Sequence, residues 1–490
     1  MRYSRVLTVR LSVIAVVSLL AGVFACTSAP GDEGPGNSRL SQVLKFVPDT
    51  PDNRSNVLIV DYVRAREVSG ASLPAPEAGS DEVLAYVVAL QKQRLIGAGG
   101  FMSGMDQYVL QTPITRANVG FGAQDVDVDL TAGKPPYTLE VVSGRLDGER
   151  SAGAISLASA ASPAVSSRYA SEDYKGVTIH SWGSGLDVNL AERLSPPVFD
   201  SLGRAMPMAV LDEYALRYPT VEGIKGMIDV GSGDRDRSNS ATRSLAVVRE
   251  YKLLAETCAS NGAACVLMSD QVQNAGSFPA QASDGSPLLR PYLALAVGTG
   301  GDEKGLYALA VLVHASADLA QQNIDLLKRR IAEASSQQAS RPWRELIPEA
   351  DVQSDGTILI AKLRTASVTL ALQAFYARDP LLLSEGGVPP TTSAAQPTGS
   401  SGTTYPKSVT TPIMTSTTPP LTAVPTSTMG FTAHIPKAEL DHSIVYPLLG
   451  KIRELYDGEV PPHAIKGARI ARRWRSGPVY HDNVVDEYCC

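Results

Sequence analysis

Histidine and serine are the residues that would first suggest catalysis in this chain, because together with a carboxylate they form hydrolase triads. Residues 45–385 contain only two histidines, His180 and His314, each near the end of an apolar segment. Ser184 and Ser232 lie between glycines, but neither has the Gly-x-Ser-x-Gly spacing of a nucleophile elbow. We expect both histidines to be hydrogen-bonded structural residues, and the sequence predicts no triad.

The glycine-rich stretch at residues 298–305 could cradle a phosphate group. A phosphate loop needs a second glycine followed by lysine and serine or threonine, but Glu303 stands where this glycine belongs. The dinucleotide fingerprint fails at the same residue, and a carboxylate would repel a phosphate. The stretch is therefore predicted to be the loop of a hairpin.

Two acidic clusters could bind calcium, which prefers carboxylate oxygens. Asp125, Asp127 and Asp129 alternate with valines, so a strand would place all three on one face. A solvated strand face is favoured over a metal site. Residues 234–238 begin like an EF-hand loop, but their arginines would repel a cation and Leu245 stands where the bidentate glutamate belongs. No metal and no cofactor is predicted.

The chain holds five cysteines in three settings. Cys258 and Cys265 flank a short turn sequence, and in an oxidising compartment this spacing predicts a local disulfide. A metal pair is the alternative, but no histidine or further cysteine lies nearby. Cys489 and Cys490 end the chain and could pair with another chain or stay reactive thiols. The fifth, Cys26, follows an apolar stretch.

Residues 1–26 have the three parts of an export signal. Three arginines precede an apolar stretch at residues 11–20, and small residues come shortly before Cys26. The apolar stretch is too short for a comfortable membrane span, which needs about 20 apolar residues to cross about 30 Å of hydrocarbon.

Val23-Phe24-Ala25-Cys26 resembles the bacterial lipobox, which has an aliphatic residue three positions before the cysteine and a small residue just before it. The resemblance implies that the Cys26 thiol carries a diacylglyceryl group and becomes the N-terminus after cleavage. Phe24 departs from the usual small or aliphatic residue at its position. Residues 27–44 follow as a predicted flexible tether. The alternative is cleavage near Ala25, which would release a soluble protein.

The pattern of apolar residues predicts strands and helices in alternation. The expected elements are a hairpin at residues 126–130 and 137–142, a helix at 147–160, a strand at 177–182, a helix ending near 258, a strand at 265–268, a hairpin at 292–297 and 306–313, a helix from Asp318 and a strand at 357–364. The order hairpin, helix, strand occurs twice, which indicates a duplicated unit.

Composition divides the rest of the chain. The sequence predicts an α/β core of the α+β type at residues 45–385, with two related halves at 45–200 and 201–385 and largely antiparallel sheets. The core resembles uncharacterised exported α/β lipoproteins, a resemblance that implies no activity. Residues 386–430 are mainly threonine, serine and proline, which predicts a disordered linker or a glycosylated stalk. Residues 431–490 form a short basic C-terminal segment.

A basic stretch with one aromatic residue stands out in this C-terminal segment. It consists of Lys466, Arg469, Arg472, Arg473, Trp474 and Arg475. Such a stretch could lie on an anionic surface such as lipid headgroups or an acidic wall polymer. A solvated chain end is the favoured interpretation.

Net charge and motifs limit the classes of function. A net charge of −6 argues against nucleic acid as a general partner, because phosphate binding needs a basic surface. The sequence favours a lipid-anchored protein on the extracytoplasmic face of the cell membrane that binds or scaffolds a solute, a wall polymer or a partner protein. An envelope hydrolase using carboxylates and a structural or assembly component are the alternatives. A binding protein should have a cleft between the halves. A hydrolase should have convergent titratable groups, and a structural component should have an unpaired edge strand.

The anchor can be tested by replacing its cysteine. We expect Cys26→Ala to move the protein from the membrane fraction to the soluble exported fraction, because the thiol that carries the lipid is gone. Fractionation followed by immunoblotting measures this, with Cys258→Ala as the matched control that should stay in the membrane fraction. A Cys26→Ala chain that remains in the membrane fraction would exclude the lipid as the anchor.

Overall fold

The computed structural model describes residues 38–92, 112–161, 163–183, 186, 199–201, 204–232, 243–272, 285, 287–336, 339–365 and 380–385. The chain divides into two compact units, Met1–Thr398 and Gly399–Cys490, and all described residues belong to the first. Among these residues, no helix combines the length and apolarity that a membrane span needs.

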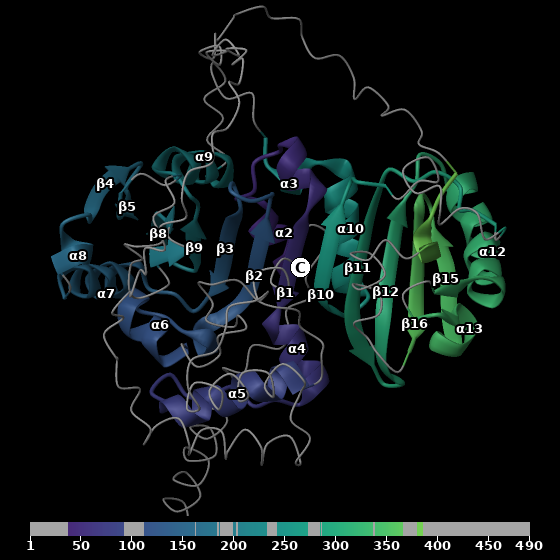
Figure 1. The fold of residues 1–490 in the computed structure, drawn as a ribbon, viewed down its shortest axis with the longest axis horizontal. Helices are drawn as coiled ribbons and strands as arrows, with labels where there is room; N and C mark the ends of the chain where they lie inside the picture. Colours follow the sequence, from purple (N-terminus) through teal and green to yellow (C-terminus); the bar gives the residue numbers. More distant parts are fainter. Residues whose placement is uncertain are drawn as a thin grey trace, which may run out of the picture. The chain divides into compact units, whose positions relative to one another are not determined.

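Twelve strands form one sheet in which every neighbouring pair is antiparallel (Figure 1). In sheet order they are β15 (Glu349–Asp355), β16 (Ile358–Arg364), β12 (Gly305–Val313), β11 (Ala294–Asp302), β10 (Ala263–Ser269), β1 (Val57–Asp61), β2 (Val126–Ala132), β3 (Leu139–Gly144), β9 (Tyr214–Arg217), β8 (Met208–Val210), β5 (Val177–Ser181) and β4 (Ala170–Tyr174). The predicted α+β class with a largely antiparallel sheet is confirmed. Two small hairpins lie outside this sheet, β6 (Asp200–Ser201) with β7 (Arg204–Ala205) and β13 (Ser335–Ser336) with β14 (Arg341–Pro342).

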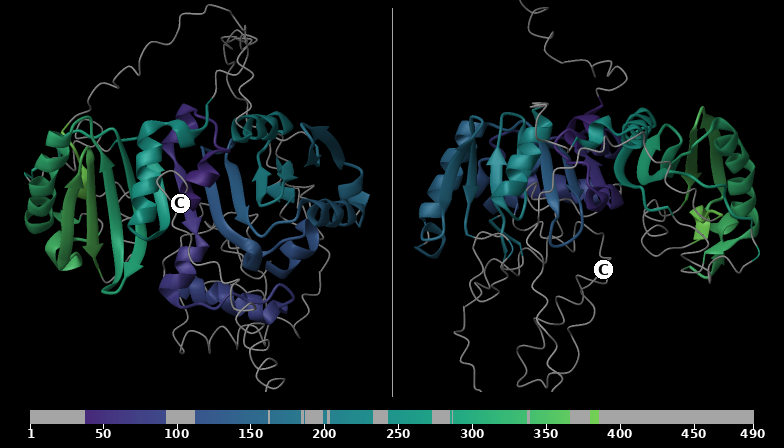
Figure 2. Two further views of the ribbon diagram at one scale, coloured as in Figure 1. Left: turned by 180° about the vertical axis from the view of Figure 1, so that it is seen from behind. Right: turned by 90° about the horizontal axis from the view of Figure 1, so that it is seen from above.

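Helices cover both faces of the sheet (Figure 2). Those whose buried residues pack on what we call the first face are α4 (Tyr62–Ser69), α5 (Ser80–Lys92), α6 (Thr112–Val119), α7 (Gly148–Ala160), α8 (Pro163–Ser166), α12 (Ala317–Glu333) and α13 (Trp343–Leu346). The second face is covered by α2 (Arg39–Leu44), α9 (Val221–Gly231) and α10 (Arg249–Ser260). The short helix α3 (Pro51–Ser55) contacts β10 and β2. Short 3₁₀ turns occur at Ala123–Asp125, Leu245–Val247 and Pro380–Leu382.

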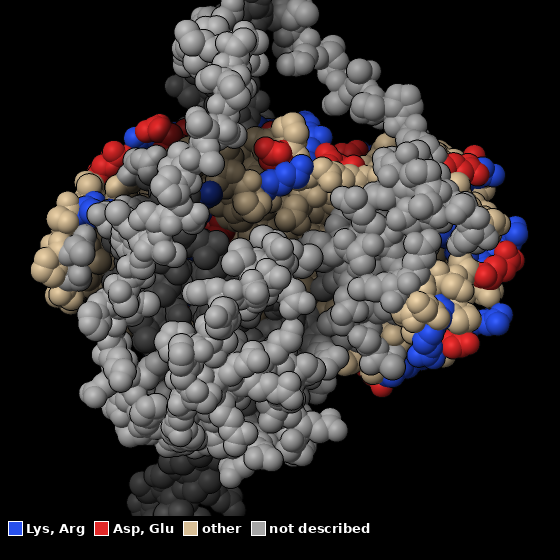
Figure 3. All heavy atoms as spheres, in the orientation of Figure 1, with Lys and Arg blue, Asp and Glu red and all other residues tan. Residues whose placement is uncertain are grey.

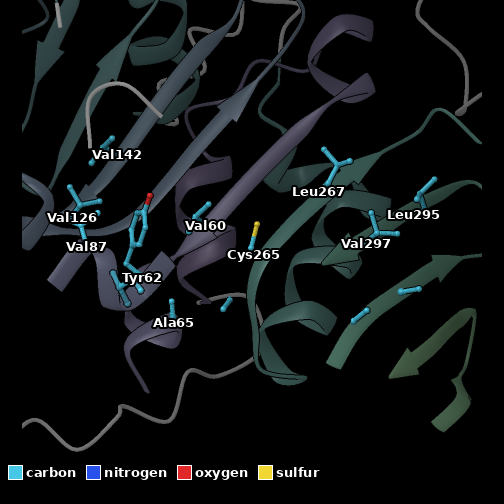
Figure 4. Close-up of a cluster of buried hydrophobic side chains, with 14 of the residues drawn as sticks. Val60, Tyr62, Ala65, Val87, Val126, Val142, Cys265, Leu267, Leu295 and Val297 are labelled. Atoms are coloured by element: carbon cyan, nitrogen blue, oxygen red, sulfur yellow. The ribbon is translucent and has the colours of Figure 1, made fainter. Parts of the chain in front are cut away.

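Side chains alternate between the two faces along each central strand, as extended backbone requires. On β10, Cys265 and Leu267 belong to the hydrophobic cluster of the first face, whereas Val266 and Met268 belong to that of the second. Figure 4 shows Val60 of β1 beside Cys265 in the first cluster. Each cluster contains residues from both ends of the chain's core, so the sheet is one body with two buried faces.

The strand order reveals a repeated arrangement. A single strand, a hairpin, a helix and a second hairpin occur as β1, β2–β3, α7 and β4–β5, and again as β10, β11–β12, α12 and β15–β16. The two sets, called the first and second halves here, meet at the antiparallel pair β1–β10. The predicted hairpin–helix–strand unit is thus present, and its last strand is one arm of a hairpin. The first half also contains β8–β9, which lies between β3 and β5 in the sheet.

The predicted glycine loop is mostly strand. Residues Gly298–Asp302 belong to β11, and only Glu303 and Lys304 separate it from β12. A Cβ atom on Gly298 would lie 2.2 Å from the carbonyl oxygen of Cys265, so glycine lets β11 approach β10 closely. The prediction was wrong because the glycines serve packing between strands, which a local pattern cannot distinguish from a turn.

Helix α12 confirms the helix expected from Asp318, with one change at its start. The N-cap is Ser316, whose hydroxyl accepts a hydrogen bond from the backbone N–H of Leu319 at 3.4 Å. Asp318 instead occupies the first turn, where its charge favours the helix dipole. Leu327 and Ile331 are buried, as their spacing predicts.

Replacing Gly298 tests the close approach of β10 and β11. We expect Gly298→Ala to lower the free energy of unfolding by about 1–3 kcal/mol, because the added methyl group collides with backbone. Gly153, inside α7 with nothing within 4 Å of its Cβ position, is the control. Gly153→Ala should raise the free energy of unfolding by about 0.5–1 kcal/mol. Urea denaturation measures both, and a Gly298→Ala chain as stable as the wild type would contradict the assigned packing.

Candidate functional site

The outer strand β15 is one end of the sheet, and within the described residues no strand pairs with its outer side. Its side chains alternate sharply in exposure. Glu349, Asp351, Gln353 and Asp355 are exposed and point to the second face, whereas Val352 is buried in the cluster of the first face. We call Glu349, Asp351 and Asp355 the acidic row.

The acidic row has no ion pair among the described residues, although cations lie directly across the strand pair. Arg364 faces Glu349 in the register, but its guanidinium binds the Asp302 carboxylate at 2.7 Å. Lys362 faces Asp351, and its Nζ lies 5.1 Å from the centroid of the Tyr307 ring. Because both cations have other partners, the negative charge of the row is not cancelled locally.

The opposite edge, β4, differs in this respect. Its Glu172 binds Lys225 of α9 at 2.8 Å, and Tyr174 donates a hydrogen bond to Asp229 of the same helix at 2.9 Å. Hydrogen bonds to Glu172 and Glu222 raise the pKa of Lys225. On β4, Glu172 is therefore paired with a lysine of α9, whereas on β15 no described cation pairs with the acidic row and no described strand pairs with the outer backbone. Figure 3 shows acidic and basic side chains intermixed at the end of the core where α12 lies.

A row of cross-strand partners that includes buried charges crosses the first face in the first half. Thr131, Glu140, Arg217, Met208 and His180 are successive cross-strand partners on β2, β3, β9, β8 and β5. Arg217 Nη1 donates to Glu140 Oε2 at 3.2 Å, with side chains 2% and 6% exposed. Sequence reasoning missed this pair because its members are 77 residues apart. Such a buried pair is weak evidence for stability, but it favours one register for the inserted hairpin β8–β9.

The same face of the second half contains no such charges at matching positions. The corresponding cross-strand row is Val297, Ala310, Ala361 and Val352, all within the apolar cluster. The two halves therefore share a framework, but the strands of the first half carry a buried ion pair, whereas strand β15 of the second half carries an exposed acidic row.

Both histidines of the core are hydrogen-bonded and buried, as predicted. His180 Nδ1 lies 2.9 Å from the Tyr169 hydroxyl. His314 Nδ1 lies 3.2 Å from the Thr357 carbonyl oxygen, and its Nε2 lies 2.7 Å from Asn323 Nδ2. Burial lowers the pKa of each imidazole to about 4, so both are neutral at pH 7. Neither has a serine or cysteine nucleophile among these contacts.

Asn323 is also part of a clamp that holds residues 380–385 against the core. Arg330, fully buried in α12, donates from Nε to the Leu381 carbonyl oxygen at 3.1 Å. Arg290 binds the Glu385 carboxylate at 2.6 Å, and its own backbone N–H donates to Asn323 Oδ1 at 2.6 Å. Backbone hydrogen bonds between Leu289 and its neighbours Leu383 and Glu385 complete the clamp. The end of the described core is thus held firmly by α12.

The three aspartates predicted on one strand face have separate structural roles. Asp125 lies in a 3₁₀ turn before β2 and accepts a hydrogen bond from the Gly122 N–H at 3.0 Å. Asp127 binds Arg66 at 3.0 Å, and Asp129 is buried within β2. A bulge at the start of β2 also breaks the alternation. The predicted solvated face was therefore wrong, and no group of three or more metal-binding side chains occurs in the described ranges.

The predicted disulfide is not formed. Cys258 of α10 and Cys265 of β10 are both buried but are not joined. Cys258 packs in the cluster of the second face, whereas Cys265 points to the first face (Figure 4). Two thiols on opposite sides of a sheet cannot reach the roughly 2 Å separation of a disulfide. Burial also raises the pKa of Cys258, which leaves an inert thiol.

Other predicted features lie outside the described residues. These are Cys26, Ser184, residues 234–238, the linker at 386–430, the basic stretch at 466–475, and Cys489 with Cys490.

Comparison with known proteins gives little further information. No protein-family model and no curated protein matches the chain. Among solved structures, crystal forms III, I and IV of TP0453 are similar at 9%, 11% and 10% identity, with TM-scores of 0.29, 0.29 and 0.31. They cover 68%, 69% and 67% of this chain and 97%, 98% and 94% of theirs. TM-scores this low support no inference about fold or function.

The buried histidines predict a loss of stability in mild acid. The unfolded chain takes up protons near pH 6.5, but both folded imidazoles resist protonation until about pH 4. Stability should therefore fall as pH drops from 6.5 to 4, by up to roughly 3 kcal/mol per histidine. Urea denaturation across this range measures the loss, and His180→Gln and His314→Gln should each flatten the slope. A slope unchanged in both variants would contradict the assignment.

Proposed function

We propose that this protein is a lipid-anchored lipoprotein on the extracytoplasmic face of the membrane, where it scaffolds a partner protein through the edge of β15. The export signal and the lipobox resemblance at Cys26 support the address. The acidic edge strand β15 is the observation that supports the proposed binding of a partner protein. An edge strand offers a row of backbone donors and acceptors to which an extended segment of another protein can add.

Charge on β15 selects among the three kinds of ligand that the sequence left open. The acidic row would repel an anionic wall polymer, because like charges are not cancelled there. A solute-binding protein of two lobes needs a cleft between separable domains. Here the halves share one sheet and both hydrophobic clusters, so they do not form lobes around a hinge. A polypeptide with positive charges is the ligand that fits both the backbone edge and the carboxylates.

Natural edge strands are often protected from pairing by charge. On β4 Glu172 is paired with Lys225 of α9, and the strand has five residues. On β15 none of the seven residues pairs with a described strand on the outer side, and the carboxylates all lie on one face. This arrangement rejects neutral or acidic strands but accepts a basic one, which gives the edge selectivity.

Site-specific photocrosslinking in membranes tests the proposal. A benzoylphenylalanine at Gln353 lies in the centre of the exposed face of β15, and one at Ser171 on β4 is the control. We expect a discrete protein adduct from position 353 that weakens when Glu349, Asp351 and Asp355 become lysine, because the carboxylates attract the partner. No adduct at position 353 above the level at position 171 would overturn the scaffold function.

A further inference from the structure

We propose that the partner of β15 is a second copy of this chain, which adds its residues 469–475 as an antiparallel strand beside the acidic row. This inference rests on the proposed scaffold function and identifies its ligand. In the proposed register Glu349 faces Arg475, Asp351 faces Arg473 and Asp355 faces Arg469.

The spacing of charge on the two strands carries the proposal. In an antiparallel pair, side chains two residues apart on one strand face partners two residues apart on the other. The acidic row has one uncharged position, Gln353, and the basic stretch has one on the matching face, Ala471. In the proposed register these two uncharged residues face each other, so all three carboxylates meet arginines.

Other registers lose this match. Slipping the antiparallel pair by two residues leaves one carboxylate facing an arginine, and a parallel pair over the same seven residues leaves two. A slip of one residue would move every side chain to the opposite face. Arginine can bind carboxylate through two parallel hydrogen bonds. These bonds add geometric specificity as well as energy, so they favour the register with three pairs.

The opposite face of the added strand would continue the apolar first face. Trp474 would face Ala350, which packs against the first hydrophobic cluster beside α12. Arg472 would face Val352, where its alkyl stem can cover the valine while the guanidinium reaches water. The segment therefore offers apolar contact on one face and ion pairs on the other. These two faces match the apolar and acidic faces of β15.

A second copy is favoured as the source of the segment by the predicted membrane anchor. Copies anchored through Cys26 would share one membrane plane, where their mutual concentration is high.

Charge reversal on each strand, alone and combined, tests the pairing in the full exported chain carrying Cys26→Ala. We expect sedimentation to show self-association that E349K/D351K/D355K weakens at least tenfold, since each exposed ion pair contributes modestly and three are reversed. R469E/R473E/R475E should weaken it equally. The six-fold variant should restore association, because the charges again match. A synthetic peptide of residues 465–475 should compete with association of the wild type.

Matched controls separate pairing from folding and from net charge. E77K/E82K/E149K changes net charge equally at exposed sites of the first half, away from β15, and should leave association unchanged. Hydrogen exchange of the β15 amides should slow with rising concentration of wild type but not of R469E/R473E/R475E.

Three outcomes would overturn the inference. The first is a chain that stays monomeric at every concentration while its β15 amides are protected by residues 469–475, which would show occupation by its own segment. The second is failure of the combined charge reversal to restore association. The third is a position-353 adduct with a different protein alone, a result that would still support the scaffold function.

Discussion

The pairing of β1 with β10 determines how the rest of the core can be built. Both strands lie in the middle of the sheet, so their side chains must be apolar on both faces. Residues Val57–Val60 and Ala263–Met268 meet this requirement almost without interruption. Because the two halves share this seam, neither can bury its faces alone. The strands added on either side of this pair end in two edge strands, β15 and β4. The two edges differ in the side chains that they expose.

An ion pair buried between strands distinguishes the first half from the second. The pair of Glu140 and Arg217 occupies a position where the second half has only alanine and valine. Desolvating two charges costs several kcal/mol, which their attraction repays only with good geometry. Their contribution is thus specificity for the register of β9 against β3 rather than added stability. In the second half the acidic row of β15 lies at the exposed edge, and the buried charge of Arg330 lies on α12 rather than on a strand.

Local sequence patterns predicted most helices and strands, because the spacing of apolar residues within a segment indicates its secondary structure. The hairpin β2–β3, helix α7 and helix α12 match their periodicity, and α12 begins one residue before the expected Asp318. Strand β15 was missed, because only Val352 among its seven residues is buried and the apolar pattern is correspondingly weak. The acidic residues themselves were visible, but nothing local shows that they end a sheet.

Long-range arrangement accounts for what the sequence could not predict. The spacing of Cys258 and Cys265 suggested a disulfide, but strand alternation turns one thiol to each side of the sheet. The contact of Gly298 with the Cys265 carbonyl, and the pairing of Glu140 with Arg217, join residues 33 and 77 positions apart. Such contacts follow from topology, which a single sequence does not display.

The clamp on residues 380–385 has a mechanical consequence. In the arrangement that we propose, with a membrane at one end of the chain and a neighbour at the other, the chain would experience tension. Arg330, Arg290 and the backbone bonds of Leu289 all hold the segment where that tension would enter the core. Since these bonds share a load in parallel, force would pass into α12 and the sheet behind it rather than peel away the last residues. The fold would then connect two surfaces, and its resistance to pulling would depend on Arg330, Arg290 and the Leu289 backbone together.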